Sequence, residues 1–225
     1  MAIQGGAQIP RGTKLETDIC VVGGGPAGIG LALRLARTTA LNIVLLESGG
    51  VATEPEPQEL NAGDNVGLDY YDLTLTRHRV LGGSSHKWAG WCRPMDRIDF
   101  DGRPWVPNSG WPISYDEFLP YYSDAARLCQ LDKMQWAPEE GSELPPVYVD
   151  PFVGKDVEIA LWEGSPPTKF GNVYREQLET SRQITTITNA TAVEVLSDEA
   201  GTKATGVRVA TLDGNEFTVG SRACL

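Results

Sequence analysis

Three glycines near the N-terminus have the spacing of a phosphate-binding loop. Gly23, Gly25 and Gly28 fit the pattern G-x-G-x-x-G, and they directly follow the short apolar run of residues 19–22. In such a loop the glycines permit a tight turn, a close approach of the main chain to a pyrophosphate, and close packing of a helix on a strand. We therefore predict that residues 23–28 bind the pyrophosphate of a dinucleotide.

A helix and an acidic residue complete the expected unit. Pro26 suits the first position of a helix, and Ala27 begins a segment with apolar residues at helical spacing. The free N–H groups at the start of that helix would bind phosphate. Glu47 ends the next apolar run, residues 42–46, about 20 residues after the last glycine, as expected for a ligand of ribose hydroxyls. Its charge would repel a 2′-phosphate, so NADP is disfavoured.

A second glycine pair favours a longer cofactor than NAD. Gly82 and Gly83 again permit a close approach of the backbone, and Ser84 and Ser85 offer hydroxyl donors to phosphate. Trp88 could pack beside a flat ring system. An NAD enzyme needs only one phosphate loop, whereas a longer cofactor that lies across the domain can use two.

The sequence resembles the glucose–methanol–choline (GMC) flavoprotein oxidoreductases, especially the pyranose oxidase-like and bacterial sugar dehydrogenase branch. The segments that carry the resemblance are residues 23–28, 45–50, 81–85, 105–113 and 165–171. The resemblance runs from about Asp18 to the C-terminus and implies the N-terminal, FAD-binding half of such an enzyme. The FAD-binding residues predicted from the motifs and the resemblance together are Gly23, Gly25, Pro26, Ala27, Gly28, Glu47, Ser48, Arg79, Gly82, Gly83, Ser84, Ser85, Trp88, Ala89, Gly90 and Ala192. The resemblance places Ala192 at the adenine and residues 88–90 along the pyrophosphate and flavin.

Two neighbouring residues bear on how FAD is held. Pyranose oxidases carry the histidine that links their flavin directly before the tryptophan, whereas here Lys87 has that place and His86 lies one residue earlier. We therefore predict non-covalent FAD. Lys87 either stabilises the anionic reduced flavin or points into water, and the sequence leaves both open. We interpret Cys92 as a small hydrophobic residue rather than a redox or attachment thiol.

Local patterns predict the remaining elements. Residues 54–64 are rich in Pro, Glu, Gln and Asn, which predicts a surface connection with little structure. Ser114 and Glu117 form a capping box at the start of a helix, and Asp213-Gly214 predicts a hairpin turn. The other predicted segments are a loop at 135–151, a helix at 171–182, and strands at 184–196, 204–211 and 215–219.

The predicted fold class is α/β. The resemblance implies a Rossmann-like FAD-binding domain of glutathione-reductase type with a three-stranded β-meander, and part of an inserted α+β substrate domain. The expected division is 1–100 for the first FAD segment, 101–170 for the partial substrate segment and 171–225 for the second FAD segment. The apolar run 222–225 looks like the opening of another buried strand, so we expect a fragment or one of two split subunits. The catalytic residues are unknown and are expected in the remaining half.

Composition limits the classes of partner and compartment. Lys and Arg number 19 against 30 Asp and Glu, which gives a net charge of −11, so nucleic acid and anionic membranes are disfavoured as partners. There is no run of about 18 apolar residues and no basic-then-apolar start, so we expect neither a transmembrane helix nor a secretion signal. The 4 cysteines lack CxxC spacing. We therefore predict no metal site and a reducing, cytoplasmic location.

The predicted function is that of an FAD-dependent oxidoreductase acting on CH–OH donors. The complete enzyme would oxidise a hydroxyl of a sugar, a glycoside or a related alcohol by hydride transfer to flavin. Its partners would be that small-molecule substrate and the remaining half of the enzyme, in the same or a second chain. Two alternatives stay open: a non-catalytic FAD-binding subunit whose partner chain supplies the catalytic base, and an NAD-dependent dehydrogenase that uses only the first loop. The sequence does not identify the hydroxyl or the electron acceptor.

Overall fold

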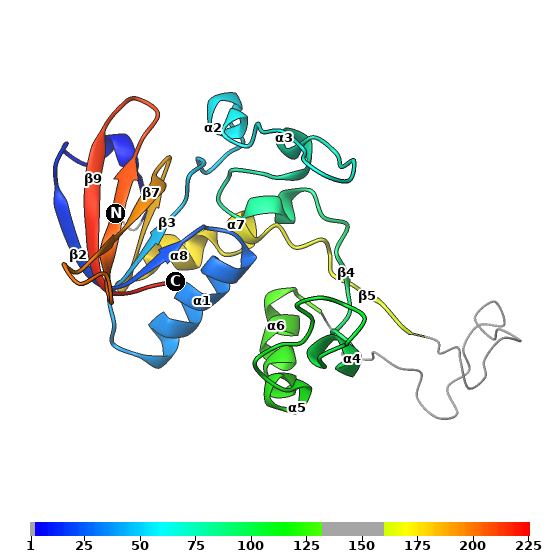
Figure 1. Cartoon of the computed structure of the whole chain (residues 1–225). Coiled ribbons are helices and arrows are strands. Elements are labelled where there is room, and N and C mark those ends of the chain that lie inside the picture. The colour runs from blue at the N-terminus through cyan, green and yellow to red at the C-terminus, as the bar shows by residue number, and fades with distance from the viewer. Residues whose placement is uncertain (1–2, 132–159) are drawn as a thin grey trace, which may run out of the picture. The chain divides into compact units, whose positions relative to one another are not determined.

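A computed structural model describes residues 3–131 and 160–225. The chain divides into a first unit, Met1–Lys87 with Lys169–Leu225, and a second unit, Trp88–Thr168 (Figure 1). Each unit is described by itself below. The loop predicted at 135–151 lies outside the described residues. No helix in the described ranges combines the length and the apolar character that crossing a membrane requires.

A seven-stranded sheet forms the first unit, with strand order β1-β6-β3-β2-β9-β8-β7. Strands β1, β6, β3, β2 and β9 pair in parallel, whereas β8 pairs antiparallel with β9 and β7 antiparallel with β8. The strands are β1 (Ile3–Gly5), β2 (Lys14–Val22), β3 (Ile43–Leu46), β6 (Ile184–Thr188), β7 (Thr191–Ser197), β8 (Ala204–Ala210) and β9 (Glu216–Cys224). This mixed α/β architecture with a largely parallel sheet confirms the predicted fold class.

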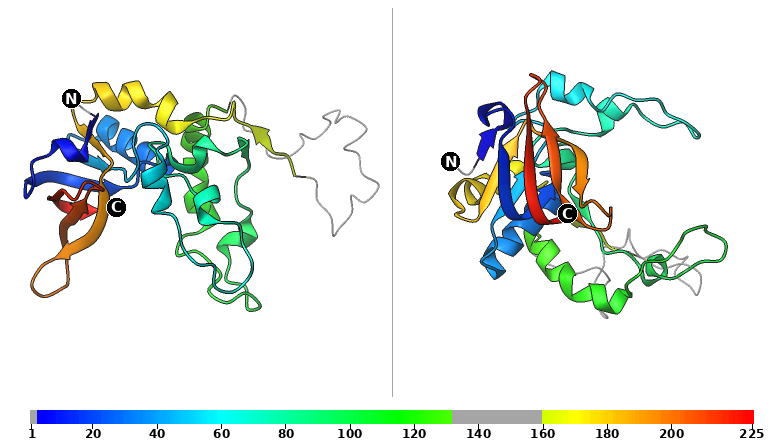
Figure 2. Two further views of the ribbon diagram at one scale, coloured as in Figure 1. Left: turned by 90° about the horizontal axis from the view of Figure 1, so that it is seen from above. Right: turned by 60° about the vertical axis from the view of Figure 1, so that its left-hand side comes forward.

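Helices cover one face of this sheet. Helix α1 (Pro26–Thr38) joins β2 to β3 and packs on β2, β3 and β6, while α8 (Arg175–Thr180) packs on β6. Figure 2 shows the two helices next to each other, as right-handed crossovers that step in one direction across the sheet require. The shorter helices of the unit are α2 (Pro55–Glu59), α3 (Leu73–Thr76), α7 (Phe170–Val173) and the 3-10 helices η1 (Gly6–Gln8) and η2 (Gly83–His86).

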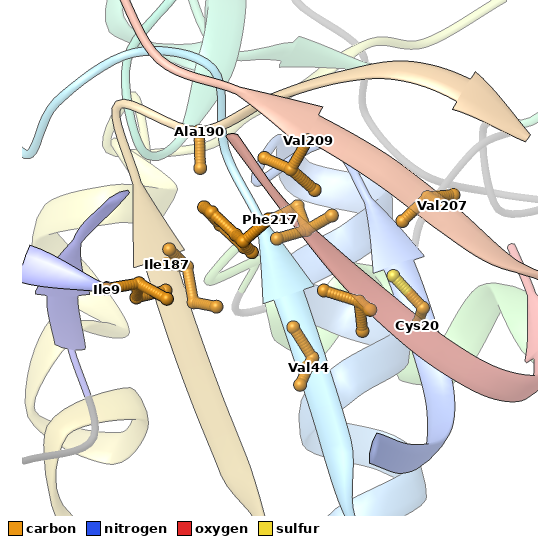
Figure 3. Close-up of a cluster of buried hydrophobic side chains, with 10 residues drawn as sticks. Ile9, Cys20, Val44, Ile187, Ala190, Val207, Val209 and Phe217 are labelled. Carbon is orange, nitrogen blue, oxygen red and sulfur yellow. The ribbon is translucent and has the colours of Figure 1, made fainter. Parts of the chain in front are cut away.

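The core on the other face lies between the parallel strands and the meander. Phe217 of β9 and Val209 of β8 join Val44 of β3 and Ile187 of β6 in one cluster of buried side chains (Figure 3). Residues on alternate positions of each strand point to opposite faces, so the continuous apolar runs of β2 and β3 serve both the helices and the meander. The sheet therefore holds the carboxyl ends of β2, β3 and β6 in fixed register.

The meander differs from its prediction at both ends. The single strand expected at 184–196 is two strands, because Asn189 takes a left-handed φ of 51° and separates β6 from β7. The apolar run 222–225 is not the opening of another strand. Instead β9 continues through Cys224, and it pairs there with Cys20 of β2 after pairing with β8. The strands β8 and β9 pack closely at Gly206, since a Cβ there would overlap the carbonyl oxygen of Val219.

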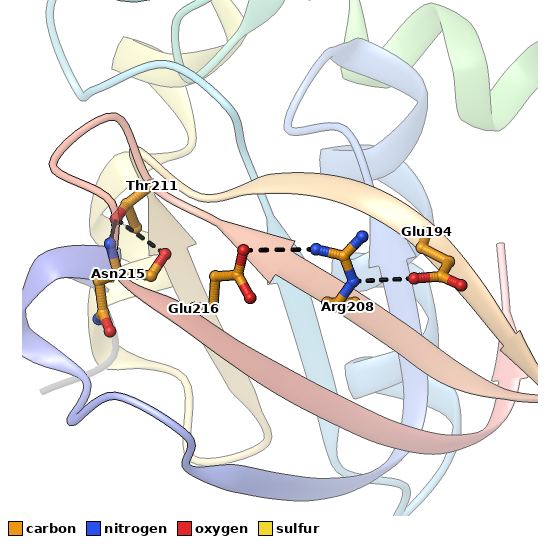
Figure 4. Close-up of polar contacts among 5 residues, drawn as sticks. All are labelled: Glu194, Arg208, Thr211, Asn215 and Glu216. Atoms are coloured by element: carbon orange, nitrogen blue, oxygen red, sulfur yellow. Dashed lines mark hydrogen bonds and ion pairs between the residues drawn. The ribbon is translucent and has the colours of Figure 1, made fainter.

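Polar contacts on the exposed face tie the meander strands together. Arg208 of β8 bonds to Glu194 of β7 at 2.8 Å (Nε–Oε2) and to Glu216 of β9 at 3.5 Å (Nη1–Oε1) (Figure 4). The hairpin predicted between β8 and β9 is confirmed, with Gly214 at φ 82°. In that turn the Asn215 N–H donates to the Thr211 hydroxyl at 3.0 Å.

Two further segments of the first unit refine the predictions. Residues 54–64 are not wholly irregular, because Pro55 occupies the first turn of the short helix α2. The helix predicted at 171–182 is confirmed as the pair α7 and α8, which are separated at Tyr174.

The second unit is built from short elements. It contains the antiparallel ribbon β4 (Trp91–Cys92) and β5 (Glu163–Gly164), the helices α4 (Arg97–Phe100), α5 (Tyr115–Phe118) and α6 (Tyr122–Leu128), and the 3-10 helix η3 (Leu119–Tyr121). The predicted capping box is confirmed: the Ser114 hydroxyl accepts the Glu117 N–H at 3.2 Å, and Glu117 accepts the Ser114 N–H at 2.8 Å. Phe100 centres an aromatic cluster with Trp111, Tyr115 and Phe118.

Candidate nucleotide-binding site

The first glycine turn closes β2 onto α1. Gly23 has φ 105°, and its N–H donates to the Leu46 carbonyl at 2.8 Å, which fixes the turn against the end of β3. A Cβ at Gly28 would overlap the carbonyl oxygen of Gly23, so this position must be glycine for the helix to start so close to the strand. By contrast, nothing in the described residues lies within 4 Å of a Cβ built on Gly25. The main chain at Gly25 is therefore open to a ligand.

The start of α1 has the properties of an anion site. Gly25 is its N-cap and Pro26 occupies the first turn. In the described residues, no side chain caps this end of the helix. The N–H groups of Ala27 and Gly28 belong to the first turn, where an α-helix provides no internal acceptor, and the helix dipole adds positive potential. A pyrophosphate would find main-chain donors here.

Glu47 lies at the carboxyl end of β3 and is buried, with 6% of its surface exposed. Its carboxylate accepts the Gly24 N–H at 2.9 Å (Oε2) and the Gly49 N–H at 2.7 Å (Oε1). Burial raises the pKa of the Glu47 carboxyl above its ordinary value, while these N–H groups and the charge of Arg79 act in the opposite direction. The carboxylate thus sits beside the first glycine turn, as a ligand of the adjoining ribose should.

The second glycine turn lies against the first. Gly82 and Gly83 have φ 101° and 55°, and the Gly82 N–H donates to the Gly24 carbonyl at 2.6 Å. A Cβ on Gly83 would come within 3.2 Å of the Gly25 Cα. Residue Gly171 of α7 supports the turn from behind, because a Cβ there would overlap the Leu81 carbonyl oxygen. Two segments far apart in sequence therefore present their backbones side by side.

The two serines of the second turn differ in what they contact. The buried Ser85 hydroxyl donates to the Gly82 carbonyl at 2.6 Å and accepts the Phe170 N–H at 3.1 Å, so it holds the turn in shape. Ser84 is exposed, and its hydroxyl accepts the His78 N–H at 3.4 Å. The role of either hydroxyl toward a cofactor stays a prediction.

Arg79 bonds directly to Ser48, and Ser48 also contacts Thr191, a residue that the sequence did not predict for the site. The Arg79 Nη1 donates to the Ser48 hydroxyl at 2.9 Å, and that hydroxyl lies 2.7 Å from the Thr191 hydroxyl. A cavity of about 610 Å³ is lined by both hydroxyl residues together with Glu54. One feature of the sequence could have indicated Thr191 as a site residue: it directly precedes Ala192, the predicted adenine residue.

Ala192 lies in β7 opposite Val209 and is partly buried. It lines a second cavity of about 390 Å³, together with Val22 at the end of β2. The loop that brings the chain to β7 is fixed to β3, because the Ala190 N–H donates to the Glu47 carbonyl at 3.0 Å. The structure therefore brings Ala192 to the same end of the sheet as Glu47.

The remaining predicted residues belong to the second unit. The Trp88 indole N–H donates to the Thr168 carbonyl at 2.9 Å, and the Gly90 carbonyl accepts the Ser165 N–H at 2.7 Å. Gly90 has φ 84°, and a Cβ there would crowd the Ser165 carbonyl. Residues 88–90, Ala89 among them, thus form one packed loop pair with 165–168. Their assignment to the flavin stays a prediction.

The histidines and cysteines offer little reactive chemistry. His86 Nε2 bonds to the Leu81 carbonyl at 3.0 Å. The ring nitrogens of His78 are buried without a hydrogen-bond partner in the described residues, and burial, with the charges of Lys87 and His86, lowers its pKa. Burial raises the pKa of the Cys92 thiol, which therefore stays protonated at neutral pH. Across the described ranges, no three His, Cys, Asp or Glu side chains gather as metal ligands would.

The known proteins that match this chain in sequence are oxidoreductases. No family model matches the chain. It is 32% identical over 130 residues to a 2-methyl-1,2-propanediol dehydrogenase of Mycolicibacterium austroafricanum, a match covering 48% of this chain and 23% of that protein. It is 33% identical over 122 residues to an uncharacterised GMC-type oxidoreductase of Rhodococcus erythropolis, covering 47% of this chain and 24% of that protein. The matches thus span about a quarter of these relatives' length.

The fold has close counterparts among solved structures. A formate oxidase variant of Aspergillus oryzae, solved to follow FAD modification in that enzyme, superposes with a TM-score of 0.59 at 21% identity. The superposition covers 96% of this chain and 46% of the oxidase chain. The likeness in fold therefore covers nearly the whole chain, whereas the sequence match to the diol dehydrogenase covers about half of it. In sequence the chain is thus similar to part of the GMC-type oxidoreductases, and its fold is that of the N-terminal half of the oxidase chain.

Proposed function

We propose that this chain binds FAD non-covalently as the FAD-binding part of an oxidoreductase that oxidises a hydroxyl of a sugar, a glycoside or a related alcohol. The observation that carries the proposal is the contact between the two glycine turns, in which the Gly82 N–H donates to the Gly24 carbonyl. A pyrophosphate lying across both turns would meet main chain from each. The names of the relatives, a diol dehydrogenase and a GMC-type oxidoreductase, support the same class of reaction.

The residues of the first unit fit such a cofactor. The space at Gly25 lets a phosphate approach the backbone, and the α1 N-terminus offsets its negative charge. Glu47 would exchange its backbone partners, or share them, to accept hydrogen bonds from the ribose hydroxyls. The main chain at Ala192 would bind the adenine.

Bound FAD would supply the acceptor for a hydride from the carbon that bears the hydroxyl. The residues of this chain would bind and orient the cofactor and exclude water from its phosphates. The substrate hydroxyl also needs a base to take its proton. We propose that this base lies in the part of the relatives that the chain does not span, carried by the same or a second polypeptide.

A binding experiment tests the cofactor. The purified chain, mixed with FAD and freed of excess ligand, should retain a flavin absorption band near ~450 nm. Denaturation should release the colour from the polypeptide, because we expect no covalent link. Flavin still attached after denaturation would contradict non-covalent binding. Failure to take up flavin, with NAD bound instead, would favour a dehydrogenase that uses only the first turn.

A reduction experiment tests the reaction. The complete protein, loaded with FAD, should bleach anaerobically when given one of a panel of pyranosides and simple alcohols. Bleaching only after a separately encoded polypeptide is added would identify this chain as a subunit without its own base. Absence of bleaching with every hydroxyl compound would reject the proposed substrate class.

The compartment is a further proposal. All 4 cysteines are free thiols in the structure, which supports the predicted reducing, cytoplasmic location.

A further inference from the structure

Arg79 lies where three segments of the first unit meet. Its Nη1 donates to the Ser48 hydroxyl at 2.9 Å and its Nη2 to the Leu60 carbonyl at 3.3 Å. Its own carbonyl is packed so closely on Gly49 that a Cβ there would overlap it. The segment that leads into the second glycine turn is therefore fixed to the segment that follows Glu47.

The contact continues from Ser48 to β7. A guanidinium can only donate, so its bond to Ser48 uses an acceptor site of that hydroxyl, and the Ser48 and Thr191 hydroxyls share a further hydrogen bond of 2.7 Å. Whichever hydroxyl donates, the pair lines the cavity of about 610 Å³ and offers it polar groups. Arg79 thus connects the ribose, pyrophosphate and adenine segments of the proposed site.

Arg79 also acts on Glu47 through its positive charge. The elements next to β3 carry no charged side chain at residues 26–33 of α1, 184–188 of β6 or 19–22 of β2. Glu54, from the loop after β3, bonds instead to the Asn189 amide at 2.7 Å. The Coulomb attraction of Arg79 opposes the cost of burying the Glu47 charge.

We propose that Arg79 is a positioning residue for FAD, which links Ser48 and Thr191 to the second glycine turn and holds the Glu47 carboxylate as an acceptor for the ribose. This inference rests on the proposed FAD binding. It assigns to Arg79 two separable roles, one of charge and one of hydrogen-bond geometry. Substitutions that keep one role and remove the other can therefore test it.

The test measures FAD dissociation constants across mildly acidic to mildly alkaline pH for the wild-type chain and matched variants. Arg79→Gln removes the charge and should weaken FAD binding about tenfold near neutral pH. As the pH is lowered, the Arg79→Gln variant should begin to lose FAD at a higher pH than the wild type, because its Glu47 takes up a proton more readily. Arg79→Lys keeps the charge, so its pH profile should stay close to that of the wild type while affinity falls less.

Two further variants separate geometry from charge. Ser48→Ala breaks the link to Thr191 but leaves the guanidinium, so affinity should fall several-fold without displacement of the pH profile. Arg182→Gln, at an exposed arginine of the same unit, should change neither. A carboxyl NMR titration of Glu47 in the FAD-free chain gives a second readout, in which Arg79→Gln should raise its pKa.

The outcomes distinguish this inference from the proposed function. If the wild type binds FAD and folded Arg79→Gln shows the wild-type affinity and pH profile, the role of Arg79 is rejected alone. If the wild type takes up no FAD, both proposals are rejected. Should Arg79→Gln fail to fold, Arg79→Lys and Ser48→Ala decide the matter: equal displacement of the pH profile in both would rule out a role of charge.

Discussion

The two units organise their predicted site residues in different ways. In the first unit the site is main chain: Gly24, Gly25 and Gly82 meet through backbone atoms at the end of a sheet with an extended core. In the second unit, the Trp88 side chain and a main-chain bond at Gly90 hold the loop at 88–90, and an aromatic cluster around Phe100 contributes packing. A site built from main chain tolerates few residue types, so its glycines are visible in sequence. A contact made by a side chain, such as that of the Trp88 indole, leaves no comparable pattern.

The largest effect on FAD binding should come from Gly28→Ala. The added Cβ would overlap the carbonyl oxygen of Gly23, and a backbone atom cannot move aside as a side chain can. We expect a loss of about 3 kcal/mol or more in the free energy of unfolding, and loss of FAD binding. Urea unfolding followed by circular dichroism measures the first, and flavin fluorescence the second.

Gly25→Ala is the matched control for that substitution. Gly25 has φ −80°, and within the described residues a Cβ there meets no atom within 4 Å. Stability should therefore be unchanged, whereas FAD binding should weaken because the methyl group occupies the space proposed for phosphate. Equal destabilisation by both substitutions would show that the two glycines do not have separate roles.

Phe217→Ala tests the core of the first unit. Phe217 is 1% exposed and contacts the cluster that joins the meander to the parallel strands. Its truncation should cost about 4 kcal/mol, as for other large-to-small changes in a core. We expect FAD binding to fall with it, because β9 supports β2. If the Phe217→Ala variant kept the full affinity for FAD while its unfolding midpoint fell strongly, FAD binding would not depend on this core.

Phe100→Ala makes the corresponding change in the second unit. Phe100 is 5% exposed and packs against three aromatic rings. We expect a loss of about 3 kcal/mol that tryptophan fluorescence detects in the second unit. FAD affinity of the first unit should change less than with Phe217→Ala. If Phe100→Ala weakened FAD binding as much as Phe217→Ala does, the proposed separation of roles between the two units would be contradicted.

Ser114→Ala should have the smallest effect. The Ser114 hydroxyl accepts the Glu117 N–H at the start of α5, and its removal leaves that donor to water. A cost of about 1 kcal/mol is typical for loss of an N-cap. Ser114→Asp keeps an acceptor at this position and should retain stability in the same denaturant titration. Identical losses in both variants would show that the hydroxyl is not acting as a cap.

The sequence predicted those parts that depend on local pattern. The first glycine turn, α1, the Ser114 capping box and the hairpin at Gly214 each follow from spacing within a few residues. The break at Asn189 was missed because asparagine, although enriched at positive φ, only rarely adopts it and so is a weak signal.

Long-range contacts were beyond such patterns. The pairing of β1 with β6, the contact between Gly82 and Gly24, and the position of Thr191 depend on segments that the chain brings together only when folded. The two turns were each predicted, but their mutual hydrogen bond was not.

The double pairing of β9 bears on how the first unit is synthesised. β9 leaves the ribosome about 200 residues after β2, yet it provides the neighbour along one whole side of that strand. Until then a nascent chain carries β2 with one row of unpaired peptide groups, next to a finished βαβ unit. Such a row readily recruits strands from other chains. Newly made protein should therefore depend on chaperones until β9 has been added.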